Sequence, residues 1–290
     1  MFFIHRLVIV PLLGSSDAVM GWTFALLVFA VLFITAAGYV INDYFDVNAD
    51  RVNKPGTNIV GELISEKSAL NLFYGLSAFG IISGFILSYW VGKINFTLIF
   101  LFSAGMLWYY SERYKCMSFF GNLVVSFLSA LSFGLVWLFD FFALKDHALQ
   151  FSVVQSNFHI VTKFVVLYMF FAFFSSLIRE MIKDLEDVDG DKKVGCQTFV
   201  VKKGTRRSKW VIMGISASLL LLLIWSQIFF LKMGYFYLFG YFIVMDLYLI
   251  FLMKKLAEAR DIVDYSNLSG LSKIFMLLGI FSMILVYFEA

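Results

Sequence analysis

Long apolar runs recur along almost the whole chain and decide what it can fold into. The longest are residues 19–42, 69–91, 94–111, 118–142, 160–182, 210–231, 234–253 and 271–288. A helix of about 20 apolar residues crosses the hydrocarbon core of a bilayer and satisfies its own backbone hydrogen bonds there. The sequence is 61% hydrophobic and only 15% charged. These patterns predict an all-α, polytopic membrane protein and exclude a soluble domain.

A shorter apolar run, residues 2–13, precedes the long ones and carries His5 and Arg6. It is too short to span a bilayer, and it lacks the cleavage signal of a secretory peptide. We expect it to be the end of a truncated first helix, which brings the bundle to about nine transmembrane segments. The sequence contains no Pro/Gly-rich linker. It therefore predicts a single membrane domain, residues 1–290, with pseudo-repeat halves at roughly 1–117 and 118–290.

Basic residues predict the orientation of this bundle. Most of the 23 Lys and Arg residues fall in alternate loops, above all within residues 179–209. The opposite loops hold only Lys93, Lys145, Lys163 and Lys232. By the positive-inside rule the basic loops face the cytoplasm, which predicts an integral protein of the inner or plasma membrane. Cys116 and Cys196 lie in these loops, so we expect reduced thiols rather than a disulfide.

Two acidic motifs follow apolar runs at matched spacing. Asp43, Asp46 and Asp50 stand at i, i+3 and i+7, which places them on one face of a helix. The same spacing returns far down the chain in Asp184, Asp187 and Asp191. A single carboxylate at membrane depth costs roughly 2.5–3.5 kcal/mol, so such groups need a compensating charge. One acidic cluster can simply mark a helix end, but two matched clusters favour halves that face one polar pocket.

Basic residues beside both motifs suggest what the pocket binds. Arg51, Lys54, Arg179 and Lys183 lie within two helical turns of the acids, and Lys115 begins a third loop on the same side. Carboxylates suit Mg²⁺, which usually keeps several waters and shares its remaining positions with substrate phosphates. The combination predicts a metal-bridged diphosphate on a lipid. The chemistry that fits is departure of diphosphate from an allylic carbon. The 36 Phe residues are more simply explained as lipid-facing bulk than as cation–π partners.

These motifs resemble those of the UbiA superfamily of intramembrane prenyltransferases. The family's N-D-x-x-D-x-x-x-D pattern matches Asn42, Asp43, Asp46 and Asp50, and its D-x-x-x-D pattern matches Asp187 and Asp191. Further similarity covers residues 110–115, the pair Gly121-Asn122 and the stretch from Gly190 to Thr198. The resemblance therefore spans most of the chain.

The resemblance implies nine helices around a central cavity, Mg²⁺ as cofactor, a polyprenyl diphosphate donor and a lipophilic or aromatic acceptor. It implies that Asp43 and Asp187 are central to catalysis and that Tyr110 lies near the reacting carbon. The metal ligands would be Asp43, Asp46, Asp50, Asp184, Asp187 and Asp191. The diphosphate would contact Asn42, Arg51, Lys54, Lys115, Arg179 and Lys183.

The acceptor stays open at this level. Residues 46–55 look most like the members that alkylate geranylgeranylglyceryl phosphate, with geranylgeranyl diphosphate as donor. Members that prenylate 4-hydroxybenzoate or 1,4-dihydroxy-2-naphthoate remain an alternative. A divalent-cation or lipid transporter is an alternative of another class, because transporters also place carboxylates at repeat interfaces. No pattern in the sequence indicates a nucleic-acid partner.

Overall fold

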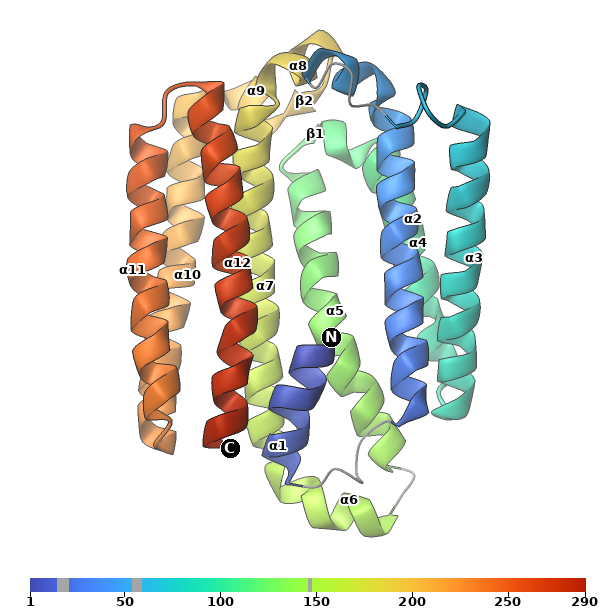
Figure 1. Ribbon diagram of the computed structural model, residues 1–290, viewed down its shortest axis with the longest axis vertical. Coiled ribbons are helices and arrows are strands. Elements are labelled where there is room, and N and C mark those ends of the chain that lie inside the picture. Colours follow the sequence, from blue (N-terminus) through green and yellow to red (C-terminus); the bar gives the residue numbers. More distant parts are fainter. Residues whose placement is uncertain (15–20, 54–58, 146–147) are drawn as a thin grey trace. The chain divides into compact units, whose positions relative to one another are not determined.

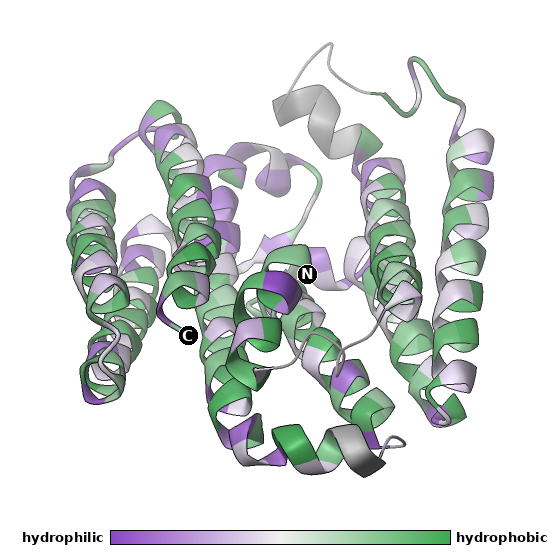
Figure 2. Cartoon of the chain, turned by 60° about the horizontal axis from the view of Figure 1, so that its bottom comes forward, coloured by the Kyte–Doolittle hydropathy of each residue, from purple (hydrophilic) through white to green (hydrophobic). Residues whose placement is uncertain are grey.

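The structure is a computed structural model that describes residues 1–14, 21–53, 59–145 and 148–290. Side chains are described for all of these except residues 48–53 and 148–150. Within the described part, eight helices are long and apolar enough to cross a membrane, and a shorter apolar helix covers Ile4–Leu13. Hydrophobic residues predominate along the long helices, and hydrophilic ones gather toward their ends (Figure 2). The prediction of a polytopic helical membrane protein with about nine segments is confirmed.

The chain forms two compact units. Unit 1 comprises Met1–Val19, Ser126–Glu186 and Lys203–Ala290, and unit 2 comprises Met20–Val125 and Asp187–Lys202. Within the described residues, the chain passes between the units inside helix α5, Phe120–Lys145, again where α7, Phe158–Glu186, ends, and once more at the end of α9, Phe199–Lys203. This division reflects packing rather than internal sequence similarity. The pseudo-repeat halves 1–117 and 118–290 stay a prediction.

Unit 2 is built on three long helices (Figure 1). They are α2, Trp22–Asn53, α3, Glu66–Trp90, and α4, Thr97–Glu112. α2 packs against both of the others. Gly80 of α3 allows a close approach, because a Cβ there would lie 2.7 Å from the Ile34 side chain and 3.0 Å from a backbone oxygen of α2. Near the motif, the Trp108 ring lies 5.1 Å from Phe73 and 5.7 Å from Phe45, in an aromatic cluster that joins the three helices.

Short elements cover the end of unit 2 that carries the first motif. They are the 3-10 helix η4, Tyr114–Cys116, the helices α8, Val188–Lys193, and α9, Phe199–Lys203, and the strands β1, Met117–Ser118, and β2, Gln197–Thr198. Of these, η4, β1, α8 and β2 lie near the motif end of α2. A further 3-10 helix, η3, Ile94–Phe96, leads into α4. β1 and β2 pair in parallel, with Met117 opposite Gln197 and Ser118 opposite Thr198. α8 packs against α2.

Unit 1 contains the remaining long helices, with α7 packed against both α10, Thr205–Met233, and α12, Ile262–Glu289. α11, Phe236–Glu258, packs on α10 and α12. The short helices are η1, Ile4–Ile9, α1, Val10–Leu13, α6, Ala148–Val154, and η5, Gln155–Asn157. Gly279 is needed where α12 meets α7, because a Cβ there would lie 2.0 Å from the Phe171 ring. η1 packs on both helices, and its fully buried His5 lies 3.5 Å from the fully buried carboxylate of Asp140.

Local sequence explains where several helices begin and end. The Ser65 hydroxyl accepts a hydrogen bond from the Ser68 N–H at 3.2 Å and caps α3, and Asp261 caps α12 through the Asp264 N–H at 2.9 Å. Gly234 ends α10 in the left-handed region, at φ 80°, where glycine carries no steric penalty. Helix α2 continues well past the apolar run, so the first acidic motif is helical throughout, as its spacing predicts.

Candidate functional site

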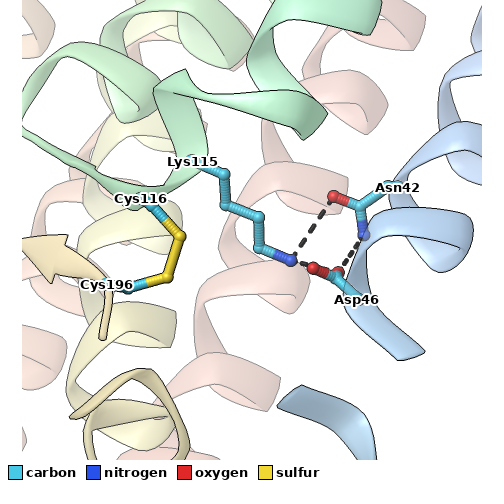
Figure 3. A network of polar contacts seen from close by, with 5 residues as sticks. All are labelled: Asn42, Asp46, Lys115, Cys116 and Cys196. Atoms are coloured by element: carbon cyan, nitrogen blue, oxygen red, sulfur yellow. Dashed lines mark hydrogen bonds and ion pairs between the residues drawn. A yellow bond between two sulfur atoms is a disulfide. The ribbon is translucent and has the colours of Figure 1, made fainter. Parts of the chain in front are cut away.

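The first motif meets a lysine from a distant loop. On α2, the Asn42 amide donates a hydrogen bond to the Asp46 carboxylate at 2.6 Å, one helical turn away. The Lys115 ammonium forms an ion pair with the same carboxylate oxygen and lies 3.4 Å from the Asn42 amide oxygen. Figure 3 shows the three side chains pointing toward one another. Asp46 is buried, at 8% exposure, so its charge depends on these partners.

The backbone around Lys115 is held close to the start of α5. Helix α4 ends at Glu112, and the 3-10 turn Tyr114–Cys116 reverses the chain. A Cβ on Gly121 would lie 2.4 Å from the Tyr114 carbonyl oxygen, which is closer than atoms can approach. The Tyr114 and Phe120 rings pack edge to face at 4.9 Å. Glycine at position 121 therefore lets the segment that carries Lys115 lie directly on α5.

The second motif differs from the sequence prediction in its local structure. Its spacing suggested one helical face, but α7 ends at Glu186 and α8 begins at Val188. Asp187 stands between them at φ −91° and ψ 5°, in the bridge region where helices end. The chain bends there, so the single-face prediction is wrong for Asp184, Asp187 and Asp191. The boundary between the two units falls at this bend, so Asp184 belongs to unit 1, and Asp187 and Asp191 belong to unit 2.

Asp191 connects the two motifs electrostatically. Burial first of all, together with the negative charges of Asp187 and Asp46, raises the pKa of its carboxyl to about 6. The Lys115 ammonium and the Thr198 hydroxyl act in the opposite direction and lower the pKa. Asp46 of the first motif, Asp187 and Asp191 of the second motif, and Lys115 therefore belong to one cluster within unit 2. Among the described side chains that act on Asp191, three carboxylates including its own face one ammonium group.

The two cysteines lie beside this cluster and form a disulfide (Figure 3). The expectation of reduced thiols is therefore wrong for this structure. That expectation considered only the cellular compartment, whereas the parallel pairing of β1 with β2 places Cys116 opposite Cys196. Their Cα atoms are 4.5 Å apart, although 80 residues separate them in the sequence.

The cluster suits a divalent cation that is shared with an anionic substrate. Within the described side chains, no three His, Cys, Asp or Glu groups converge on one point as a preformed cage. Mg²⁺ does not require such a cage, since it keeps waters and takes one or two carboxylates together with substrate phosphates. Asp46 and Asp191 are buried, and their like charges repel. A bound cation relieves that repulsion, so the residues present fit Mg²⁺.

The structure places the other predicted site residues as follows. Asp43 lies on α2 and Tyr110 on α4, both partly buried in unit 2. Arg179, Lys183 and Asp184 lie in the last turns of α7, in unit 1, where Arg179 forms an ion pair with the buried Glu180. Asp50 and Arg51 belong to α2, but their side chains lie outside the described residues, as does Lys54 entirely.

Sequence reasoning did not assign roles to Thr198 or to the cysteine pair. Thr198 is buried at 3% exposure and acts on Asp191 from the end of β2. Strands of two residues have no readable periodicity, so nothing in the sequence predicted the ladder that brings these groups to the cluster.

Comparison with known proteins identifies the family. The profile of the UbiA prenyltransferase family matches residues 7–287, nearly the whole chain. The chain belongs to this family. A digeranylgeranylglyceryl phosphate synthase of Korarchaeum cryptofilum is 31% identical over 254 residues, which cover 87% of this chain and 81% of the relative. For the protein of the same name from Methanoregula boonei, identity is 32% over 193 residues, and the match covers 66% of this chain and 61% of the relative.

Solved structures of UbiA proteins share the fold. A structure of digeranylgeranylglyceryl phosphate synthase superposes with a TM-score of 0.65 at 24% identity, covering 97% of this chain and 92% of that one. A UbiA homolog from Archaeoglobus fulgidus, bound to DMAPP and Mg²⁺, superposes with a TM-score of 0.56 at 16% identity, covering 97% of this chain and 94% of the homolog. At these identities the likeness supports the fold alone.

Proposed function

We propose that this UbiA-family chain is a Mg²⁺-dependent prenyltransferase whose donor is geranylgeranyl diphosphate and whose acceptor is geranylgeranylglyceryl phosphate. The observation that carries the proposal is the cluster in which Lys115 joins Asn42 and Asp46 of one acidic motif and acts on Asp191 of the other. The names of the relatives favour this acceptor, and the homolog bound to DMAPP and Mg²⁺ favours the donor class and the metal.

In this proposal, the acidic residues of unit 2 bind the metal and Lys115 binds the diphosphate. Asp43, Asp46, Asp187 and Asp191 would hold Mg²⁺ through carboxylate oxygens, which are the ligands it prefers. When bound, Mg²⁺ neutralises the charge that the diphosphate gains as it leaves. Lys115 donates to phosphate oxygens from a position that the Asn42 and Asp46 contacts define before the substrate arrives. Such preorganised donors act where negative charge develops in the transition state.

Bond changes in the transfer are simple. The allylic carbon–oxygen bond of the donor breaks, and its electron pair leaves with the diphosphate. The hydroxyl oxygen of the acceptor then forms the new ether bond and releases its proton. Tyr110, on α4 of the same unit, is the residue that we propose to lie near the reacting carbon. The loops with most Lys and Arg residues follow the positive-inside pattern, so we propose that this end faces the cytoplasm.

The test is prenyl transfer by the purified full-length protein. Geranylgeranyl diphosphate is supplied with geranylgeranylglyceryl phosphate, 4-hydroxybenzoate or 1,4-dihydroxy-2-naphthoate, with Mg²⁺ or with EDTA, and products are identified by mass spectrometry. We expect the diether phosphate as the main product, only with Mg²⁺. A prenylated aromatic ring instead would replace the proposed acceptor. Absence of any Mg²⁺-dependent diphosphate release would refute the enzyme and favour a transporter.

Variants separate chemistry from binding in this assay. Asp43→Asn removes a charge with little change in volume, and we expect turnover at saturating donor to fall about 10²–10³-fold, by analogy with other electrostatic stabilisers of a transition state. Lys115→Gln should mainly raise the KM for the donor, because its charge meets the diphosphate before the reaction. Asp189→Asn is the matched control, since Asp189 is exposed on α8. Near-normal turnover of Asp43→Asn contradicts the assigned role.

A further inference from the structure

The two cysteines stand at the start of the ladder in unit 2. β1 and β2 pair in parallel with Met117 opposite Gln197, and one step back in the same register Cys116 faces Cys196. Their Cα atoms are 4.5 Å apart, within the 4.4–6.8 Å range of disulfide-bonded pairs. Backbone pairing thus brings the cysteines together. The two thiols therefore stay within reach of each other when the sulfur–sulfur bond is broken.

Each cysteine is fixed to one charged group of the candidate site. Cys116 directly follows Lys115, the lysine that holds Asp46. On the other side, the Cys196 N–H donates to the Asp191 carbonyl at 2.9 Å and the Gly195 N–H donates to the Lys192 carbonyl at 3.2 Å. With Gly195 at φ 80°, these two bonds form a Schellman motif at the end of α8. The Cys196 backbone is therefore locked to the helix that carries Asp191.

The covalent bond ties together two segments whose strand pairing is short. The ladder between β1 and β2 comprises two residue pairs, and pairings of this size are not stable by themselves in water. Tyr114 lies against Gly121 and holds the β1 side to α5, but this contact does not reach the α8 side. The bond from Cys116 to Cys196 is thus the shortest covalent connection between Lys115 and Asp191.

We propose that Cys116 and Cys196 are positioning residues of the diphosphate site and that their disulfide is a reversible redox control of donor affinity. The inference rests on the proposed function. In the oxidised form, Lys115 and Asp191 are held at a fixed separation, ready for the metal-bound diphosphate. In the reduced form, the loop that carries Lys115 moves with respect to α8, and donor binding must first order it. The expected effect is on donor affinity and KM, with kcat little changed.

The redox step balances with a small-molecule disulfide such as oxidised glutathione. The Cys116 and Cys196 thiols lose two protons and two electrons and form one sulfur–sulfur bond. The small-molecule disulfide takes up both and leaves as two thiols. A dithiol reverses the exchange through a mixed disulfide.

The experiment compares oxidised and reduced protein in two independent measurements. Protein is equilibrated with oxidised glutathione or with dithiothreitol, and the linked peptide that contains both cysteines is quantified by mass spectrometry. Affinity is then measured with Mg²⁺ and a geranylgeranyl diphosphate analogue that has sulfur in place of the bridging oxygen. We expect reduction to weaken binding about tenfold, the effect of losing roughly one charge-assisted contact. The KM for the natural donor should rise in parallel, with kcat changed less than about twofold.

The chain supplies its own control, because Cys116 and Cys196 are its only cysteines. Any effect of dithiothreitol on the protein thus arises from this pair. The double variant Cys116→Ser/Cys196→Ser should bind the analogue as weakly as reduced wild-type protein does, with the same affinity in oxidised glutathione and in dithiothreitol. Reduced wild-type protein gives the same comparison if that variant does not fold. Equal affinity in the two states, or absence of the linked peptide after oxidation, overturns the inference. A protein that transfers no prenyl group, yet binds the analogue tenfold better when oxidised, refutes the proposed function alone.

Discussion

Asp191→Asn should stabilise the protein in the absence of Mg²⁺ and donor while it removes a proposed Mg²⁺ ligand. Burial and the charges of Asp187 and Asp46 raise the pKa of Asp191 from 3.8 to about 6. The folded protein therefore binds the proton more tightly than the unfolded chain does. Between these two pKa values, stability falls as the pH rises, because the carboxylate must ionise in an unfavourable place.

The size of this effect follows from the two pKa values. At 1.36 kcal/mol per pKa unit, the ionised Asp191 costs about 3 kcal/mol above pH 7. The amide of Asn is neutral but still polar and buried, so we expect a net gain of about 2 kcal/mol at pH 8. For a chain of 290 residues that corresponds to a rise of roughly 3–4 °C in Tm. At pH 5 the net gain should fall to about 0.6 kcal/mol, since wild-type Asp191 is then mostly protonated when folded and pays only about half of the ionisation cost.

The assay is thermal unfolding of detergent-solubilised protein in EDTA at pH 8 and pH 5. The matched control is Asp189→Asn, on the exposed side of the same helix, which should change stability by less than about 0.5 kcal/mol. Mg²⁺ with the donor analogue should raise the Tm of wild type more than that of Asp191→Asn, because only wild type keeps the carboxylate that we propose to bind Mg²⁺. An Asp191→Asn protein that is no more stable than wild type at pH 8 refutes the reasoning that burial and like charges dominate at this carboxyl.

Two further predictions concern the loop of Lys115 and the orientation of the bundle. Gly121→Ala places a methyl group 2.4 Å from the Tyr114 carbonyl oxygen, so the loop that carries Lys115 must move and the KM for the donor should rise about tenfold. The control is Gly105→Ala, whose methyl group meets no atom within 4 Å and should leave the KM unchanged. Equal KM values for the two variants would contradict the role of this contact. In the cysteine-free background, Asp189→Cys should react with a membrane-impermeant maleimide only from the cytoplasmic side. Labelling only from the outer side would reverse the proposed orientation.

Sequence patterns predicted the helices because bilayer length and apolarity leave few alternatives. The run at residues 69–91 corresponds closely to α3, Glu66–Trp90, and the spacing of Asp43 and Asp46 predicted a helical motif that α2 provides. The same reasoning failed at Asp187, where identical spacing crosses a break between two helices. Residues at i, i+3 and i+7 lie on one helical face only when a single helix includes all of them. A bend with ordinary residues on both sides leaves no sign in the periodicity.

The sequence predicted candidate site residues, but it did not predict the contacts between them. Lys115 was predicted as a basic residue of a third loop on the side of both motifs, but its contact with Asp46 joins residues 69 positions apart, a separation that no local pattern reports. The cysteines were judged by cellular compartment, and only the register of β1 with β2 shows that they face each other. Tertiary contacts of this kind depend on where α4 ends and on the close approach of the Tyr114 backbone to Gly121.

The charge balance of the cluster links its stability to its proposed chemistry. Among the described side chains, Asp46, Asp187 and Asp191 lie near one ammonium group, that of Lys115, so without a metal these carboxylates repel further negative charge. A diphosphate is strongly anionic and cannot enter such a cluster favourably by itself. Divalent cations reverse this balance, since they satisfy the carboxylates and give the phosphate oxygens a partner. The repulsion that lowers the stability of the empty protein is therefore the same property that makes donor binding depend on the metal.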